Sequence, residues 1–361
     1  MKVVFRTDAS IHIGTGHIMR CLTLAKALQE QGVEVAFICR AHLGHLLAKI
    51  EQAGFVGYSL PIESDVAHTE KVAEALTHAA WLGATQQQDA KACQSILEPL
   101  HPDWLIVDHY ALDAHWHAML KPFVGQLMVI DDLGDRNHLC DLLLDQNYGA
   151  TVEKYRLRVP KACKILAGVQ YALLRPEFAQ WRAFSLQRRT QNAVLNHLLI
   201  TLGGVDAKND TGLILQALAR LPSNPLAEIT VVMGATAPHL NKVIQLAKAM
   251  PIKTLVVVDV ANMAERMAHA DLAIGAAGAT TWERCCLGLP TIQMVIAENQ
   301  RLIAQALARD GVVQLMEHVD QLADLMPDVR AKLSTLSEKS SNLSDGLGCV
   351  RVVQNILESS P

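Results

Sequence analysis

The sequence predicts an α/β protein made of two Rossmann-like domains that face each other across a cleft. Short apolar runs alternate along the whole chain with longer stretches whose apolar residues recur at helical spacing. Strands that alternate with helices indicate parallel sheets with right-handed crossovers. A chain of 361 residues also has room for two domains of about 150 residues each. In both halves a strand-like run leads into a pair of glycines.

The first domain is expected over residues 1–187. Its strand-like runs are 2–5, 33–39, 54–60, 103–110, 127–132 and 142–146, with helical stretches at 18–28, 44–51 and most of 64–100. Ligands of such sheets bind outside the carboxyl ends of the strands. We therefore expect the polar residues that end these strands to cluster at one edge: Asp8, Asp108, His109, Tyr110, Asp131, Asp132 and Asn147.

The second domain is expected over residues 193–361. A helix followed by a charged linker is predicted for 176–196, and 188–192 is the predicted domain boundary. The strand-like runs of this half are 197–204, 229–234, 254–258, 272–275 and 291–295. The tail from about residue 318 is expected to be helical, with a polar break at 340–344.

Composition narrows the function classes. The net charge of −4 and the scarcity of aromatic residues argue against a nucleic-acid partner, which would bring a basic stripe or stacking rings. No apolar run reaches the roughly 18 residues of a membrane span, and the chain begins with a strand instead of a signal peptide. Eight cysteines in this length form no disulfide framework. We expect a cytoplasmic monomer with no membrane partner and no cofactor.

The first candidate site is the turn between the first strand and the first helix. Gly14 and Gly16 allow the backbone to approach a ligand closely, and the helix N-terminus would present N–H groups to it. His17, in the first helical turn, is the candidate for proton transfer. The full dinucleotide fingerprint is absent because position 19 is Met. A tight turn with an ordinary polar cap remains the alternative interpretation.

The second candidate site is segment 275–290, which reads as a strand, a glycine turn and a helix. Its small and polar residues would offer N–H groups and hydroxyls to a diphosphate, and Glu283 could accept hydrogen bonds from ribose hydroxyls. The alternative is a glycine turn followed by an ordinary capped helix. The residues proposed to bind here are Gly275, Gly278, Thr280, Thr281 and Glu283, with Gly203 and Gly204 lining the same mouth.

These two segments, together with 107–110, 130–133 and 297–300, resemble the PseG family over roughly residues 1–310. Members of that family are UDP-2,4-diacetamido-2,4,6-trideoxy-β-L-altropyranose hydrolases of pseudaminic acid biosynthesis. The second half is also similar to the UDP-binding half of GT-B glycosyltransferases such as MurG. The resemblance therefore implies a GT-B-like fold and a UDP-sugar substrate.

What the resemblance implies chemically is metal-independent, inverting hydrolysis at the anomeric carbon. His17 would be the base that activates water, since an imidazole is partly neutral near pH 7. Asp8 would orient either this imidazole or the sugar. Tyr110 and Asn299 match family positions that line the substrate site, and Arg20 would contact phosphate or pair with a carboxylate.

Three other functions stay open at this point. A GT-B glycosyltransferase would have a similar second half but would need an acceptor. A non-hydrolysing UDP-sugar 2-epimerase would need acid and base groups on both sides of the reacting carbon. A nucleotide-sugar binding protein without activity would show no turnover. For a metal, the sequence has no H-E-x-x-H motif and no other carboxylate–histidine cluster.

Overall fold

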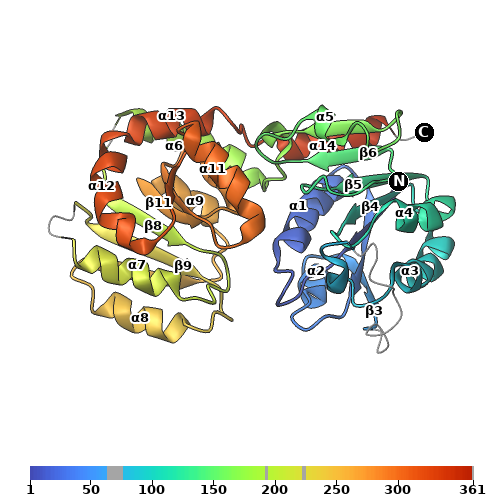
Figure 1. Ribbon diagram of the computed structural model, residues 1–361, viewed down its shortest axis with the longest axis horizontal. Helices are drawn as coiled ribbons and strands as arrows, with labels where there is room; N and C mark the ends of the chain where they lie inside the picture. Colours follow the sequence, from blue (N-terminus) through green and yellow to red (C-terminus); the bar gives the residue numbers. More distant parts are fainter. Residues whose placement is uncertain (63–75, 192–193, 222–224, 360–361) are drawn as a thin grey trace. The chain divides into compact units, whose positions relative to one another are not determined.

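The computed structural model describes residues 1–62, 76–191, 194–221 and 225–359 (Figure 1). The chain forms two compact units, the first from Met1–Leu173 with Gly348–Pro361 and the second from Leu174–Leu347. Each unit is built on one parallel sheet, with seven strands in the first and six in the second. The predicted pair of parallel-sheet α/β domains is thereby confirmed.

The first unit has the strand order β3-β2-β1-β4-β5-β6-β7. Helices cover both of its faces: α1, α2 and α14 pack on one, and α3, α4 and α5 on the other. The strands are β1 (Lys2–Thr7), β2 (Glu34–Arg40), β3 (Val56–Leu60), β4 (Trp104–Asp108), β5 (Gln126–Ile130), β6 (Leu142–Asp145) and β7 (Lys164–Ala167). The helices are α1 (Gly16–Glu30), α2 (Leu47–Gln52), α3 (Gln86–Leu100), α4 (Ala114–Leu120), α5 (Val152–Tyr155) and α14 (Gly348–Glu358).

The second unit has the strand order β10-β9-β8-β11-β12-β13. Its main core lies between the sheet and helices α7, α8, α12 and α13. The strands are β8 (His197–Thr201), β9 (Glu228–Met233), β10 (Lys253–Val258), β11 (Leu272–Ala276), β12 (Thr291–Met294) and β13 (Gln314–Met316). The helices are α6 (Pro176–Gln191), α7 (Asp210–Ala219), α8 (Leu240–Lys248), α9 (Met263–His269), α10 (Thr280–Cys286), α11 (Arg301–Arg309), α12 (Leu322–Ala331) and α13 (Leu333–Ser341).

The unit boundary differs from the predicted one. The predicted linker begins inside α6, which continues to Gln191 and packs against α9, α10 and α13 of the second unit. The last turn of α6 stays helical because the buried guanidinium of Arg189 donates hydrogen bonds to the carbonyls of Met267, Ala270 and Leu287. These hydrogen bonds fix the helix to the second unit, so the first unit ends at Leu173.

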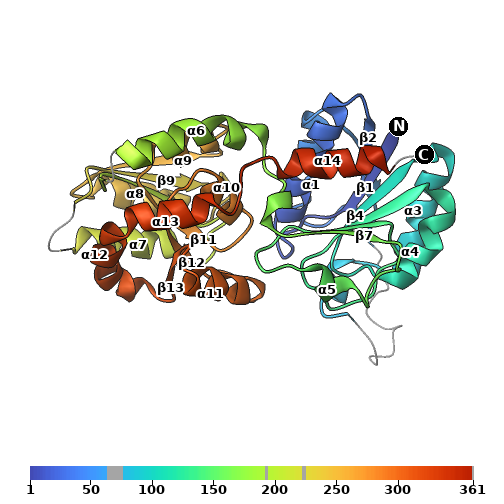
Figure 2. The same ribbon diagram turned by 90° about the horizontal axis from the view of Figure 1, so that it is seen from above.

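The C-terminal helix α14 returns to the first unit, although the sequence analysis assigned it to the second domain. Cys349, Val352, Val353 and Ile356 are buried in the same core as α1 and β1. Figures 1 and 2 both show α14 beside α1. The amphipathic pattern of the tail was correctly interpreted as helical, but a pattern does not say which sheet a helix covers.

Two short edge strands, β7 and β13, were missed because each has only a few residues. The helix expected over most of 64–100 is confirmed only as α3 and the short 3-10 helix η1 (Ala79–Trp81), while 63–75 lie outside the described residues. Among the described helices, none is both long and apolar enough to span a bilayer.

Candidate active site

The turn from β1 to α1 fixes the position of His17. The hydroxyl oxygen of Ser10 accepts hydrogen bonds from the amides of His12 and Ile13. Gly14 has a φ of +80° and donates to the carbonyl of Ser10 at 2.9 Å; this left-handed conformation favours glycine. Helix α1 begins at Gly16 without a side-chain cap. The turn over residues 8–15 therefore connects the end of β1 to the start of α1, and it brings His17 to Asp108 at the carboxyl end of β4.

His17 is hydrogen-bonded to Asp108, the last residue of the neighbouring strand β4. Its Nδ1 lies 2.6 Å from Asp108 Oδ1. Arg20, one turn further along α1, donates to both oxygens of the same carboxylate at 2.6 and 2.7 Å. Burial alone would raise the pKa of Asp108, but Arg20 and His17 outweigh it and hold that pKa below its ordinary value. Asp108 is thus an anion at neutral pH.

This pairing selects one form of the imidazole. Arg20 Nη2, which can only donate, also lies 3.3 Å from Nδ1, but the contact with the carboxylate is much shorter. Since a carboxylate only accepts hydrogen bonds, we assign the proton to Nδ1, which leaves Nε2 of a neutral ring with a free lone pair. Among the described residues none hydrogen-bonds to Nε2, and the residue is 8% exposed. The arrangement gives a nearly buried base with one nitrogen available, which is the geometry of an oriented general base.

The structure places Asp8 away from His17. Its carboxylate accepts from Arg6 Nη1 at 2.6 Å and from the amide of Arg40 at 2.7 Å, and it lies 3.2 Å from Nε2 of His109. Successive strand residues point to opposite faces. Thr7 is the register partner of Asp108, so Asp8 points to the face covered by α3. The expectation that Asp8 orients His17 is therefore corrected: Asp108 does so.

Arg20 and Tyr110 both contact Asp132. Arg20 Nη1 donates to Asp132 Oδ2 at 3.2 Å, and the Tyr110 hydroxyl donates to Oδ1. Of the two roles expected for Arg20, the structure shows pairing with carboxylates. The Tyr110 ring meets the His17 ring edge-on, with centroids 4.7 Å apart. Tyr110 thus lies against the imidazole, as a residue lining the same site would.

In the second unit, Gly275 and Thr281 have structural roles. Gly275 lies inside β11, paired with Thr201 and Gln293. A Cβ at Gly275 would lie 2.4 Å from Nη1 of Arg284. Arg284 is buried and donates to the carbonyl of Ala276 and the hydroxyl of Thr281. Both residues therefore border a buried guanidinium in this structure, and their expected contact with a diphosphate stays a prediction.

Other residues of this segment remain open to a ligand. Gly278 has only Gln300 near an added Cβ, at 3.4 Å. Thr280 is half-buried in the first turn of α10, and its hydroxyl oxygen accepts a hydrogen bond from Arg284 Nη1 at 3.1 Å, while a hydroxyl can still donate. Burial raises the pKa of Glu283 to about 7 against the opposing charge of Arg175, whose Nη2 is 3.9 Å away. The side chain of Asn299 lies outside the described part of the structure.

Gly203 and Gly204 follow β8, as predicted. Gly203 has a φ of +89°, and the carbonyl of Gly204 accepts a hydrogen bond from the amide of Gly234 at 3.1 Å. A Cβ at Gly234 would lie 2.4 Å from that carbonyl oxygen. The close contact of two strand ends here explains one glycine, Gly234, that the sequence analysis did not single out.

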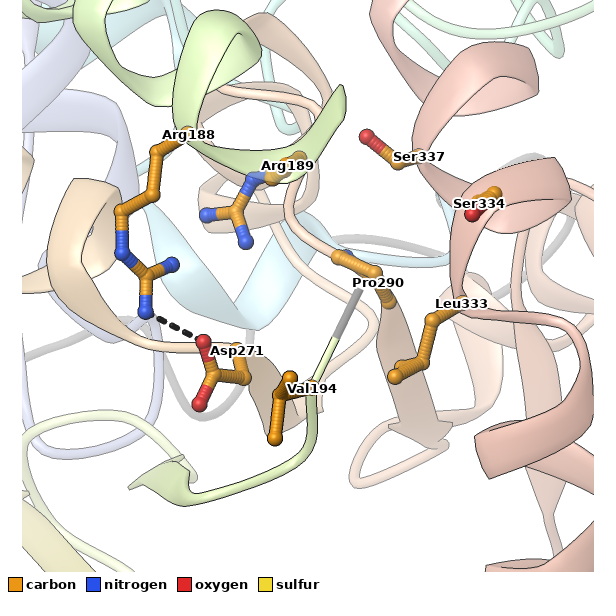
Figure 3. A pocket seen from close by; sticks show the side chains of 8 residues that line it. All are labelled: Arg188, Arg189, Val194, Asp271, Pro290, Leu333, Ser334 and Ser337. Carbon is orange, nitrogen blue, oxygen red and sulfur yellow. Dashed lines mark hydrogen bonds and ion pairs between the residues drawn. The ribbon is translucent and has the colours of Figure 1, made fainter. Parts of the chain in front are cut away.

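A separate cavity in the second unit lies at the opposite end of the strands (Figure 3). Asp271 directly precedes β11 and Pro290 directly precedes β12, so this cavity is at the amino edge of the sheet. Arg188 pairs with Asp271, as Figure 3 shows. The free volume is about 10 Å³, close to what one water molecule needs. It is too small for a nucleotide.

The described residues contain no group of three or more His, Cys, Asp or Glu side chains arranged to hold a metal ion.

Comparisons with known proteins show what the chain is similar to in sequence and in fold. Residues 197–347 match the family described as "Glycosyltransferase family 28 C-terminal domain". The UDP-2,4-diacetamido-2,4,6-trideoxy-beta-L-altropyranose hydrolase of Campylobacter jejuni is 28% identical over 86% of this chain and 97% of its own. The spore coat polysaccharide biosynthesis protein SpsG of Bacillus subtilis is also 28% identical, over 66% of this chain and 83% of its own.

Among solved structures, MurG of Acinetobacter baumannii superposes with a TM-score of 0.67 at 17% identity, covering 99% of both chains. At that identity the likeness shows the fold, which is the GT-B-like pair of domains expected from the sequence. The chain is therefore similar over most of its length to the Campylobacter hydrolase, its residues 197–347 match the glycosyltransferase family 28 C-terminal domain, and its fold is MurG-like.

Proposed function

We propose that this protein hydrolyses UDP-2,4-diacetamido-2,4,6-trideoxy-β-L-altropyranose to the free sugar and UDP, as a cytoplasmic monomer in pseudaminic acid biosynthesis. The observation that carries the proposal is the 2.6 Å contact between His17 and Asp108, which leaves Nε2 as a base. The similarity to the Campylobacter hydrolase supports the choice of substrate.

In the proposed reaction, Nε2 of His17 takes a proton from a water molecule while the water oxygen attacks the anomeric carbon. The bond between that carbon and the phosphate oxygen breaks, UDP leaves with the bonding electron pair, and the configuration at the carbon inverts. UDP is a good leaving group, so the step mainly needs a base. A positioned base contributes typically about 10²–10⁴-fold. Asp108 stabilises the imidazolium that forms, and neither a metal nor another cofactor takes part.

We propose that the second unit holds UDP. Gly203, Gly204 and Gly278 offer backbone close to a ligand, with Thr280 at the start of α10. Glu283 would accept hydrogen bonds from ribose hydroxyls in its ionised form. The family 28 match over this unit supports a nucleotide-sugar role, and Asn299 is proposed to contact the sugar.

The test is UDP release from the diacetamido sugar nucleotide without an acceptor, comparing the wild type with His17→Asn. The expected result is release by the wild type and at least a hundredfold slower release by the variant, with unchanged affinity for UDP. Equal rates for the two proteins would remove His17 from the mechanism. Arg301→Gln is a suitable control, because Arg301 pairs with Glu298 and Glu317 on the surface.

A glycosyltransferase is the alternative, favoured by the family 28 domain and the MurG-like fold. It predicts no UDP release until an acceptor is added. A protein that binds UDP-sugar but releases no UDP with any acceptor would instead support a binding protein without activity.

A further inference from the structure

Three aromatic rings from two segments gather beside His17 in the first unit. Trp81 ends the 3-10 helix η1 and stacks on Tyr110 with ring centroids 5.6 Å apart and planes 27° apart. His78 contacts both rings, at 4.4 Å from Trp81 and 5.3 Å from Tyr110. The Trp81 ring also faces the His17 ring edge-on at 6.4 Å. These rings form one wall beside the proposed base.

The rings differ in how much water reaches them. Tyr110 is 5% exposed, whereas Trp81 and His78 are both half-buried. Tyr110 is held by its hydroxyl on Asp132, so it backs the cluster, and Trp81 is the large ring left partly open next to a base. Buried cores rarely need an indole at the edge of a polar site, whereas ligand pockets are commonly lined by aromatic side chains.

We propose that Trp81, backed by Tyr110 and His78, is the sugar-contacting residue that selects for a deoxygenated, acetamido-bearing hexose. The inference rests on the proposed function, because it assigns a part of that substrate to this wall. A 2,4-diacetamido-2,4,6-trideoxyhexose presents a C6 methyl and two acetamido methyls at positions where a common hexose presents hydroxyls. Such an edge loses little on leaving water and packs on the face of an indole.

The charge state of the wall suits this role. Burial lowers the pKa of His78, so the ring is mostly uncharged near pH 7. The groups facing it are the charged Asp132, Asp135 and Arg136, with His17 beside them. Arg136 also lies 5.7 Å from the Tyr110 ring centroid. An uncharged apolar wall next to these ions leaves one side of the site fit for methyl groups.

The second unit provides a matched cluster without a proposed ligand. Trp181 lies edge-on to Phe184 at 5.4 Å and to His269 at 5.4 Å, and it is half-buried like Trp81. These residues lie on α6 and at the end of α9, and α9 leads into the amino edge of β11. Trp181→Ala therefore removes an equivalent indole from an equivalent cluster outside the candidate site.

The experiment measures binding in proteins that also carry His17→Asn, so that turnover does not interfere. The probes are the UDP-diacetamido-trideoxyhexose, UDP-N-acetylglucosamine and UDP alone. Trp81→Ala is expected to weaken binding of the first about tenfold, to affect the second less, and to leave UDP unchanged. Trp81→Phe should recover part of the loss, and Trp181→Ala should show none of these effects.

The outcomes separate this inference from the proposed function. Equal weakening for all three probes, or none for any, would overturn the role of Trp81, whether or not the wild type releases UDP. Sugar-selective weakening in a protein whose wild type releases no UDP would support the wall and overturn the hydrolase. Absence of detectable binding of the diacetamido nucleotide to the parent would overturn the wall as a site for that sugar.

Discussion

The carboxyl edges of the two sheets carry polar residues and glycines in similar places, yet they use them differently. In the first unit, Asp108 of β4 and Arg20 of α1 hold an imidazole so that one nitrogen stays unpaired within the described residues. In the second unit, Gly275 of β11 and Thr281 of α10 surround the guanidinium of Arg284. One edge orients an imidazole, and the other buries a guanidinium.

The difference shows that a glycine near the carboxyl end of a strand can meet two different physical requirements. Gly14 has a positive φ and open space around its missing side chain, so the backbone there is free to approach a ligand. Gly275 has no such φ, and its missing side chain is replaced by a neighbour's guanidinium. A methyl group added at Gly14 would be strained by the positive φ, whereas one added at Gly275 would collide with the guanidinium of Arg284.

The largest expected effect comes from Asp108→Asn. An amide in this place can no longer fix the proton on Nδ1, because it also offers an N–H donor. We expect kcat for UDP release to fall about 10²–10⁴-fold, by analogy with the buried Asp of the Ser-His-Asp triad, with little change in the affinity for UDP. The check is steady-state kinetics together with calorimetric titration of UDP.

Asp132→Asn is the matched control for that variant. Asp132 also pairs with Arg20 and Tyr110 but does not contact His17. We expect a loss in kcat of less than about tenfold. Equal losses in the two variants would mean that Arg20, and not the imidazole, is the group that the carboxylates position.

The two units also differ in which parts of the chain form their cores, because the C-terminal helix α14 packs into the core of the first unit. Ile356 of α14 is fully buried in the first core, so Ile356→Ala should lower the free energy of unfolding by about 3 kcal/mol. Hydrogen exchange should show the loss of protection in β1 and β4. Val350→Ala, at a 50% exposed position of the same helix, should change little. Faster exchange confined to β8 and β11 would contradict this assignment of α14.

Glu283, at the carboxyl edge of the second sheet, should make the stability of the protein depend on pH. Burial raises its folded-state pKa from an ordinary 4.5 to about 7. Between these values the unfolded carboxyl releases its proton and the folded one keeps it, so stability falls as pH rises from 4.5 to 7. The total is about 3 kcal/mol. Glu283→Gln should lack this fall and be the more stable protein at pH 8, as denaturant unfolding at both pH values would show.

The same residue should give UDP binding a pH dependence. Ribose hydroxyls donate to a carboxylate more strongly than to its protonated form, so wild-type affinity for UDP should rise through pH 7. In Glu283→Gln the affinity should be lower and nearly independent of pH. A variant that binds UDP as the wild type does at pH 8 would remove the ribose contact from the proposal.

The sequence predicts the strands of both sheets well because each is a short apolar run between polar turns. The sequence also singles out His17 in the first helical turn after two glycines. The structure places it against Asp108, and its role as the base stays a prediction. Of the two roles expected for Asp8, orienting the imidazole is wrong because Phe5 and Thr7 share the face of α1, whereas Asp8 does not. Knowing that Thr7 is the register partner of Asp108 requires the order of the strands, which a single sequence does not state.

Arg284 was missed for a related reason. A charged residue in a short helix is usually exposed, and only the contact with Gly275 and Ala276 shows that this one is buried. The position of α14 was likewise hidden, since an amphipathic helix fits either sheet. The local sequence pattern thus predicts most helices and strands, whereas the pairing between distant segments depends on packing.

The smallest expected effect compares Gly275→Ala with Gly278→Ala. An added methyl at Gly275 would lie 2.4 Å from Arg284 Nη1, so we expect a loss of about 2 kcal/mol in unfolding free energy. Since Gly275 faces Arg284, the affinity of the Gly275→Ala variant for UDP should stay within about twofold of the wild type. Denaturant unfolding and UDP titration of the same samples provide both values.

At Gly278 an added methyl meets only Gln300, at an ordinary 3.4 Å. Its stability should change by less than about 0.5 kcal/mol, while UDP binding weakens because the methyl occupies the space that a diphosphate would approach. The opposite pattern, with UDP binding lost in Gly275→Ala at unchanged stability, would mean that β11 itself contacts the nucleotide. In that case the guanidinium of Arg284 must move when the nucleotide binds, and the second edge would resemble the first.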